Sequence, residues 1–248
     1  MHDNRTGDLL DATVALVPAY NEAGSILAVV QQLKDAGVGG CIVAIDCNSR
    51  DNTASLLNST GIYYTVSQKT GYDFSMIEAA RRIPEWYPQC QYIFCTDAGK
   101  KFTYESLPQF VKAFNEGADM VLGIRTQTVG MLWHQRLGTQ VILFLINILF
   151  NSSIKDISPF RMIRYSKFLT LNMSPRRFRW PSEMLVKCLA LGYQIVQIPI
   201  ISGARSAGTS NVSGKLYNSI KAGLDMFSSL RFVLYRRNNH SPHISHVK

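Results

Sequence analysis

The stretch ATVALVPAYNEAGSI, residues 12–26, decides the fold of this chain. It opens with a short run of apolar and β-branched residues, which is typical of a buried strand. The run ends near Pro18, and the polar pair Asn21-Glu22 follows before apolar residues return at helical spacing. The stretch therefore predicts a strand, a polar turn and a helix, in that order.

The same order of strand, polar turn and helix recurs along the first half of the chain. Such alternation predicts an α/β fold with a mostly parallel, Rossmann-like sheet flanked by helices. Binding and catalytic groups in such sheets lie at the carboxyl ends of the strands. Further strands are expected over residues 41–46, 62–66, 92–95 and 120–123, and helices over residues 75–83 and 107–115.

Two acidic residues stand at the expected strand ends. Asp46 closes one apolar run, and Asp97 follows another after a single threonine. Each opens a polar segment that favours a turn. This is the placement expected of an active-site carboxylate in a parallel sheet.

The second half of the chain has a different character. Residues 131–151 are strongly apolar and predict a long helix. Residues 216–236 combine apolar with basic residues, as an amphipathic helix does. A helix over residues 182–191 and a strand over residues 194–198 are expected between them. Two terminal stretches show no periodicity and are expected to be flexible: residues 1–11 and residues 237–248.

The composition restricts the class of protein. A chain of 248 residues suits one sizeable domain, here residues 12–236. Lys and Arg exceed Asp and Glu by 26 − 17 = 9 charges, which favours phosphate-bearing partners. No nucleic-acid-binding module is recognisable, so nucleic acid is not an expected partner.

The cysteines and the lengths of the apolar runs indicate the cellular compartment of the protein. The five cysteines form no Cys-x-x-Cys pair and no cluster with histidine, so no zinc site is expected. The first residues lack the apolar core of a signal peptide, and no apolar run reaches about 18 residues. We therefore expect a cytoplasmic protein. The apolar residues 141–150 and the helix 216–236 either lie peripherally on a membrane, or pack on the sheet or in a homodimer interface.

The order of these motifs resembles that of family 2 glycosyltransferases with a GT-A fold. The closest likeness is to dolichyl-phosphate mannose synthases and polyprenyl-phosphate glycosyltransferases. The likeness covers roughly residues 12–226, and the order and spacing of the motifs carry it. The family's Pro-x-Tyr-Asn-Glu loop corresponds to residues 18–22, and its Asp-Asp-Gly-Ser-x-Asp-x-Thr turn to residues 46–53. Its Asp-x-Asp strand end corresponds to residues 97–99, its Asp-x-x-Ser-Gly-Phe-Arg element to residues 156–161, and its Arg-x-x-Gly-x-Ser-Lys-Val-Ser-Gly loop to residues 205–214.

This resemblance implies an inverting transferase that moves a hexose from a nucleotide-diphosphate sugar, UDP- or GDP-linked, to an acceptor such as a polyprenyl phosphate. Residues 12–125 would bind the nucleotide sugar, and residues 126–236 would face the acceptor and the membrane. The donor-binding residues implied are Pro18, Ala19, Tyr20, Glu22, Asp46, Lys69, Gly71, Asp97 and Ala98.

The chain departs from the family pattern at two positions. Cys47 replaces the second acid of the turn after the second strand, so the choice of base is open. Gly99 replaces the second acid of Asp-x-Asp, because Asp97 lies eight residues before Glu105 as the family's first acid does. The family's acids bind Mg²⁺ or Mn²⁺. With Asp97 alone, metal binding is expected to be weak or absent.

Basic residues are the candidates for the diphosphate or for a phosphate on the acceptor. The side chain of Lys100 or Lys101 would replace part of the metal's charge, unless both are solvated loop residues. Others implied by the resemblance are Arg125, Arg136, Arg205 and Ser210.

The acceptor decides whether a catalytic base is needed. A hydroxyl acceptor requires a carboxylate within hydrogen-bond reach, and Asp156 and Glu183 are the candidates beside Asp97. An acceptor phosphate is already ionised, so positioning and electrostatics would carry the rate.

Alternatives remain at this point. Asn21 and Asp51 are equally typical of residues that begin helices. A nucleotidylyltransferase would need a glycine-rich phosphate loop after the first strand, which is not present there. Cys47 and Gly99 favour a non-catalytic homologue that binds nucleotide or regulates a partner, whereas the retained acids and arginines favour the transferase.

Overall fold

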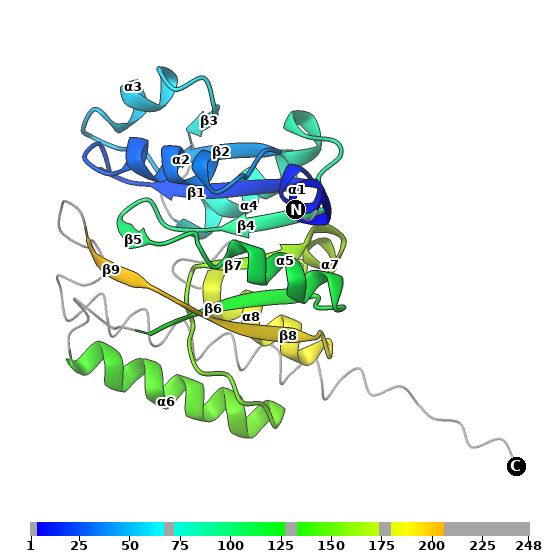
Figure 1. The fold of residues 1–248 in the computed structure, drawn as a ribbon. Coiled ribbons are helices and arrows are strands. Elements are labelled where there is room, and N and C mark those ends of the chain that lie inside the picture. The colour runs from blue at the N-terminus through cyan, green and yellow to red at the C-terminus, as the bar shows by residue number, and fades with distance from the viewer. Residues whose placement is uncertain (1–3, 67–71, 127–132, 174–179, 206–248) are drawn as a thin grey trace, which may run out of the picture.

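The computed structural model describes residues 4–66, 72–126, 133–173 and 180–205 (Figure 1). A central sheet of seven strands has the order β3-β2-β1-β4-β7-β6-β8. A separate two-stranded ribbon pairs β5 with β9. The strands are β1 (Thr13–Ala19), β2 (Cys41–Asp46), β3 (Tyr63–Val66), β4 (Tyr92–Cys95), β5 (Lys100–Phe102), β6 (Met120–Arg125), β7 (Arg161–Arg164), β8 (Ile195–Ile200) and β9 (Ser202–Arg205).

The sheet is mixed but mostly parallel, as predicted. Strands β3, β2, β1 and β4 are parallel neighbours, and β6 and β8 are also parallel. Only β7 runs antiparallel to both of its neighbours, β4 and β6. As a result β7 begins at the edge of the sheet where β4 and β6 end.

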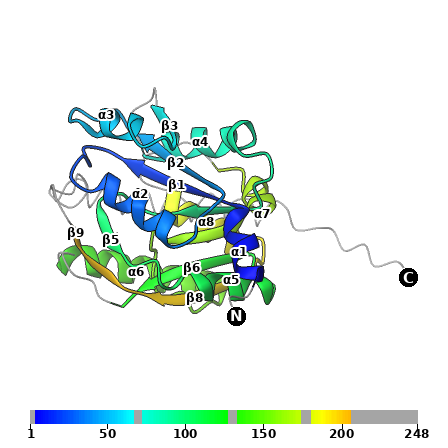
Figure 2. The same cartoon turned by 45° about the horizontal axis from the view of Figure 1, so that its top comes forward.

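Helices cover both faces of the sheet (Figures 1 and 2). The helices α1, α2, α3 and α5 contribute to one apolar core, and α4, α6, α7 and α8 to the other. The apolar residues of α2, Ile26, Val29, Val30 and Leu33, are all buried, as their helical spacing requires. The helices are α1 (Asn4–Asp11), α2 (Ile26–Asp35), α3 (Thr53–Asn58), α4 (Tyr72–Trp86), α5 (Leu107–Asn115), α6 (Trp133–Phe150), α7 (Tyr165–Thr170) and α8 (Trp180–Ala190).

The expectation of a flexible lead-in over residues 1–11 is wrong for residues 4–11, which form α1. Leu9 and Leu10 of this helix are buried in the core that α2 and α5 share. The hydroxyl of Thr13 donates to the carbonyl of Leu9 over 2.8 Å, which joins the helix to β1. A helix of eight residues offers too few apolar positions for its periodicity to stand out in the sequence.

Three short strands were not predicted: β5, β7 and β9. Strand β7 reads Arg-Met-Ile-Arg, and its two arginines suggest an exposed segment, although its first three residues are buried. Strand β9 reads Ser-Gly-Ala-Arg, and its small residues are more typical of a loop than of a strand. Within the described residues, none of the helices is both long and apolar enough to span a membrane.

Candidate active site

Polar groups gather at one edge of the sheet, because the parallel strands end there. Asp46 is the last residue of β2, and Asp97 follows β4. Arg125 is the last residue of β6. Strand β7 starts at this same edge, where Arg161 is paired with Cys95 of β4, and Asp156 precedes it in the chain. The fold thus places along one edge of the sheet acidic and basic residues that are up to 110 residues apart in the chain (156 − 46).

The loops after β1 and β2 are joined by hydrogen bonds. The backbone N–H of Asn21 donates to Oγ of Ser49 over 2.9 Å, and the N–H of Arg50 donates to Oδ1 of Asn21 over 2.8 Å. Asn21 adopts a left-handed conformation, with φ of 56°, which asparagine tolerates better than most residues. Asn21 therefore connects two loops and does not cap a helix.

Asp51 has a structural role in this connection. Its Oδ2 accepts the N–H of Ala23 over 3.2 Å, and its Oδ1 accepts the N–H of Thr53 over 3.0 Å. Thr53 is the first residue of α3, and its hydroxyl oxygen accepts the N–H of Glu22 over 2.9 Å. The carboxylate thus satisfies a donor at the start of α3, as expected if Asp51 begins a helix. Burial raises the pKa of Asp51, but the hydrogen bonds from Thr53 and Ala23 outweigh burial and lower that pKa.

Two of the candidate donor-binding acids are buried beside these loops. Asp46 accepts both the N–H and the hydroxyl of Ser49 at its Oδ1, over 3.1 and 2.5 Å. Glu22 accepts the hydroxyl of Ser25 at Oε2 over 2.8 Å. Ser25 directly precedes α2, but its side chain makes no hydrogen bond that caps this helix. Buried carboxylates held in this way are ready to accept hydroxyl or N–H groups of a ligand.

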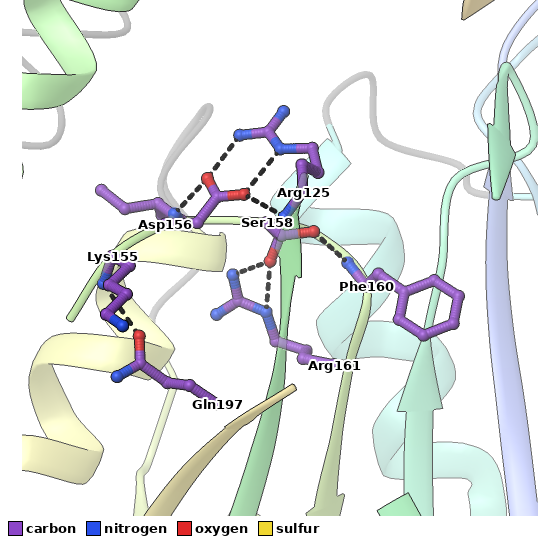
Figure 3. A network of polar contacts seen from close by, with 8 residues as sticks. Arg125, Lys155, Asp156, Ser158, Phe160, Arg161 and Gln197 are labelled. Atoms are coloured by element: carbon purple, nitrogen blue, oxygen red, sulfur yellow. Dashed lines mark hydrogen bonds and ion pairs between the residues drawn. The ribbon is translucent and has the colours of Figure 1, made fainter. Parts of the chain in front are cut away.

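The most complete ion pair of the site joins Arg125 to Asp156 (Figure 3). Nε and Nη2 of Arg125 donate to the two carboxylate oxygens over 2.8 and 2.6 Å, so the pair is bidentate. The backbone N–H groups of Arg125 and Ile157 donate to the same carboxylate over 3.0 and 2.7 Å. Four donors on one carboxylate fix both side chains at the end of β6.

The pKa values of this pair move apart. Burial raises the pKa of Asp156, but the hydrogen bonds and charge of Arg125, with two backbone N–H groups, outweigh burial and hold it below its usual value. Burial lowers the pKa of Arg125, yet Asp156 and then Asp97 outweigh it and raise that pKa. A carboxylate with a lowered pKa and four donors is a weak base, so this geometry favours an orienting role for Asp156 over proton abstraction.

Asp97 is half-buried at the end of β4, and its charge acts on several neighbours. It contributes to the raised pKa of Arg125 and, after burial, to that of Tyr72, which stands well above its usual value. Burial chiefly raises the pKa of Tyr104 to about 12, with a further contribution from Asp97. Among the described residues, no three His, Cys, Asp or Glu side chains form a metal cluster. Asp97 therefore offers one carboxylate ligand, and a cation there would depend on phosphate oxygens of the donor.

Arg161, the last residue of the Asp-x-x-Ser-Gly-Phe-Arg-like element, is wholly buried. Its Nε donates to the carbonyl of Ser158 over 2.9 Å, and Nη2 donates to the same oxygen. Its Nη1 donates to the carbonyl of Pro181, at the start of α8, over 2.6 Å. Burial lowers the pKa of Arg161. The side chain thus joins the loop before β7 to α8, a role that sequence reasoning missed although the motif included this arginine.

Glu183 is buried in the first turn of α8 and is paired with Lys187, one turn later. Its Oε1 lies 2.6 Å from Nζ of Lys187, which also donates to the carbonyl of Asn172 over 2.7 Å. Asp73, which the sequence did not single out, accepts the N–H of Trp180 over 3.1 Å and so satisfies a donor at the start of the same helix.

The other candidate residues fall into three groups. Pro18, Ala19 and Ala98 are at or next to strand ends, and Tyr20 is half-buried after β1. The backbone of Lys100 is paired with that of Arg205 in the β5–β9 ribbon, with Lys101 next to it, and Arg136 is an exposed residue of α6. Three candidates lie outside the described residues: Lys69, Gly71 and Ser210.

Comparisons with known proteins identify the family of this chain. The family model for glycosyl transferase family 2 matches residues 14–174. An uncharacterized glycosyltransferase of Mycobacterium tuberculosis is 31% identical over 222 residues, which cover 88% of this chain and 97% of that protein. A dolichyl-phosphate hexose transferase of Haloferax volcanii is 25% identical over 207 residues, which cover 80% of this chain and 86% of that protein.

Solved structures share the fold. Glucosyl-3-phosphoglycerate synthase from Mycobacterium tuberculosis, in complex with Mn²⁺, UDP-glucose and phosphoglyceric acid, superposes with a TM-score of 0.72 at 14% identity and covers 90% of this chain and 83% of its own. Mannosyl-3-phosphoglycerate synthase from Rubrobacter xylanophilus gives a TM-score of 0.72 at 13% identity, over 99% of this chain and 81% of its own.

The match extends from β1 past β7 and includes each strand-end acid and arginine of the site. The GT-A fold expected from the sequence is confirmed by these structures. On the family match and the relative of 31% identity, this chain belongs to glycosyl transferase family 2.

Proposed function

We propose that this chain is an inverting hexosyltransferase that uses a UDP- or GDP-linked sugar and delivers the hexose to a phosphate carried by a lipid. The donor's nucleoside would lie against the joined loops after β1 and β2, next to Tyr20, Glu22 and Asp46. Its diphosphate would reach the strand ends at Asp97 and Arg125.

Charge at the strand ends supports the placement of the diphosphate. Arg125 is held in its charged form beside Asp97, and Asp156 fixes its orientation. A preoriented guanidinium stabilises the negative charge that develops on a leaving diphosphate. A divalent cation held by Asp97 and the donor would add to this charge, and with one carboxylate ligand we expect the metal requirement to be weak.

The observation that carries the lipid acceptor is an apolar stripe on α6. Leu137, Val141, Phe144 and Ile148 follow one another at intervals of four, three and four residues, and each is at least 44% exposed. The opposite face of the helix buries Ile142 and Ile146 in the core. Large exposed apolar residues in one row mark a surface that contacts lipid or protein. The dolichyl-phosphate hexose transferase among the relatives supports lipid in this case.

A direct transfer assay tests the proposal. The purified chain is incubated with radiolabelled UDP-glucose or GDP-mannose, and with vesicles that contain a polyprenyl phosphate. Label in the lipid extract is the expected result. A parallel reaction contains 3-phosphoglycerate, since phosphoglyceric acid is bound in a structural neighbour, and label that enters only this compound would overturn the lipid acceptor. Absence of transfer, together with no thermal shift by any nucleotide, would favour a non-catalytic homologue.

A further inference from the structure

The segment from Asn151 to Ile157 connects the end of α6 to the carboxylate that holds Arg125. Asn147 of α6 binds this segment through its whole side-chain amide. Nδ2 donates to the carbonyl of Ile154 over 2.9 Å, and Oδ1 accepts the N–H of the same residue over 2.8 Å. Oδ1 also accepts the hydroxyl of Ser152 over 2.9 Å. One asparagine thus satisfies both backbone groups of Ile154.

A second amide binds the same segment from the edge strand of the sheet. Oε1 of Gln197, in β8, accepts the N–H of Lys155 over 2.8 Å (Figure 3). Its Nε2 donates to the carbonyl of Ser153 over 3.0 Å. Gln197 and Asn147 therefore bond alternate residues, Ser153 and Lys155 on one side and Ser152 and Ile154 on the other.

Asp156 is the residue that follows these bonds directly, and its carboxylate accepts two side-chain donors and the backbone N–H of Arg125. We infer that Asn147 and Gln197 are positioning residues for Arg125, acting through Asp156. This inference rests on the proposed function, because it assigns Arg125 to the donor diphosphate. Catalytic geometry is sensitive to displacements of about 1 Å, so loss of either amide should be felt at the reaction.

The test compares the transfer kinetics of Asn147→Ala and Gln197→Ala with those of the wild-type protein. Each variant should lower kcat/KM for the nucleotide sugar by about tenfold, within the range that small misplacements produce. Gln197→Glu keeps an acceptor for the Lys155 N–H but sets a carboxylate oxygen against the carbonyl oxygen of Ser153, so it should not retain the wild-type kcat/KM. The control is Gln140→Ala, at an exposed position of α6, which should leave kcat/KM unchanged.

A double-mutant cycle with Asp156→Asn separates positioning from general loss of structure. If Asn147 acts through Asp156, then adding Asn147→Ala to Asp156→Asn should lower kcat/KM by less than twofold, since the path is already broken. The dissociation constant for the donor nucleotide is measured for the same four proteins and should show the same lack of additivity.

The outcomes distinguish the inference from the proposed function. A wild-type protein that transfers sugar, with an Asn147→Ala variant that is unchanged or fully additive with Asp156→Asn, overturns the inference alone. A wild-type protein that neither transfers sugar nor binds nucleotide overturns the proposed function and the inference with it.

Discussion

Nη2 of Arg125 lies 2.6 Å from Oδ1 of Asp156, and each side chain is only 9% exposed. Both groups come from segments that meet only because β7 runs antiparallel beside β6. The two residues therefore have different roles. The charge of Asp97 acts on the guanidinium of Arg125, whereas the carboxylate of Asp156 orients that guanidinium through hydrogen bonds.

Removal of one member of this pair should destabilise the fold. Asp156→Ala leaves the Arg125 guanidinium buried without its partner, which costs about 3–5 kcal/mol in comparable pairs. Urea denaturation of the variant and the wild type measures the loss. Glu85→Ala is the control, because the Arg82–Glu85 pair is exposed and pairs of that kind contribute about 1 kcal/mol or less. Equal losses in the two variants would contradict a structural ion pair at Asp156.

The lowered pKa of Asp156 predicts how this contribution depends on pH. The unfolded carboxyl has a pKa of about 3.9, and the folded one lies below its usual value. A depressed pKa stabilises the fold above the unfolded pKa and loses that effect as the pH falls through the folded pKa. The difference in unfolding free energy between wild type and Asp156→Asn should therefore be constant from about pH 5 to 8 and shrink below about pH 4. A difference that shrinks as the pH rises from 5 to 8 would mean that the pKa of Asp156 is raised.

The fold was predictable from the sequence wherever apolar periodicity is strong. The strand 41–46 and the helix 107–115 have the predicted bounds, and the long apolar helix ends within two residues of its predicted bounds. Strand β7 was not predictable, because the strand buries Arg161 and satisfies it with the carbonyls of Ser158 and Pro181. Charge in a sequence indicates exposure, and only the folded chain shows that two backbone oxygens offset the cost of burial.

The positions of the acids at strand ends were predictable from the sequence, but their contacts were not. Asp46 and Asp97 lie at or just after strand ends, as expected, and Arg125, which the family resemblance implied, ends β6 at the same edge of the sheet. The roles of Asp156 and Glu183 could not be read in the same way. Each is paired with a cation, Arg125 or Lys187, and only the folded chain shows these pairings.

Gly123 has a position that a side chain cannot share. A Cβ there would lie 2.8 Å from Cδ1 of Ile200 and 2.9 Å from Cδ1 of Phe160. Gly123→Ala should therefore destabilise the protein by about 1–3 kcal/mol, as overpacking does. Gly138→Ala is the matched control, because a Cβ in that part of α6 meets nothing within 4 Å and alanine favours helices by up to about 1 kcal/mol. Thermal unfolding should show opposite shifts, and a Gly123→Ala variant as stable as wild type would contradict the close contact.

The single carboxylate at the metal position predicts partial activity without a metal. With EDTA the transfer rate should fall but stay measurable, since Arg125 and the lysines after Gly99 supply positive charge. Lys100→Ala should lower the rate in EDTA further, because Lys100 follows Asp97 by three residues and its backbone is paired with that of a second basic residue, Arg205. Lys112→Ala, at an exposed position of α5, is the control for lost charge. Complete loss of the wild-type activity in EDTA would show that a metal is indispensable.

The stripe on α6 predicts binding to lipid surfaces. Phe144 and Ile148 are its most exposed members, at 64% and 61%, and burying such side chains in the interface between headgroups and acyl chains contributes about 1.5–3 kcal/mol each. Phe144→Asp should therefore lower the fraction of protein that sediments with vesicles containing anionic lipid by about tenfold or more. Leu169→Asp is the control, since Leu169 is similarly exposed, at 55%, but belongs to α7.

Phe144→Asp should also slow transfer to a polyprenyl phosphate in vesicles and leave transfer to a short-chain, water-soluble analogue unchanged. Equal vesicle binding by the two variants would mean that the stripe contacts something other than lipid, and a change from dimer to monomer in Phe144→Asp would identify that partner as a second copy of the chain.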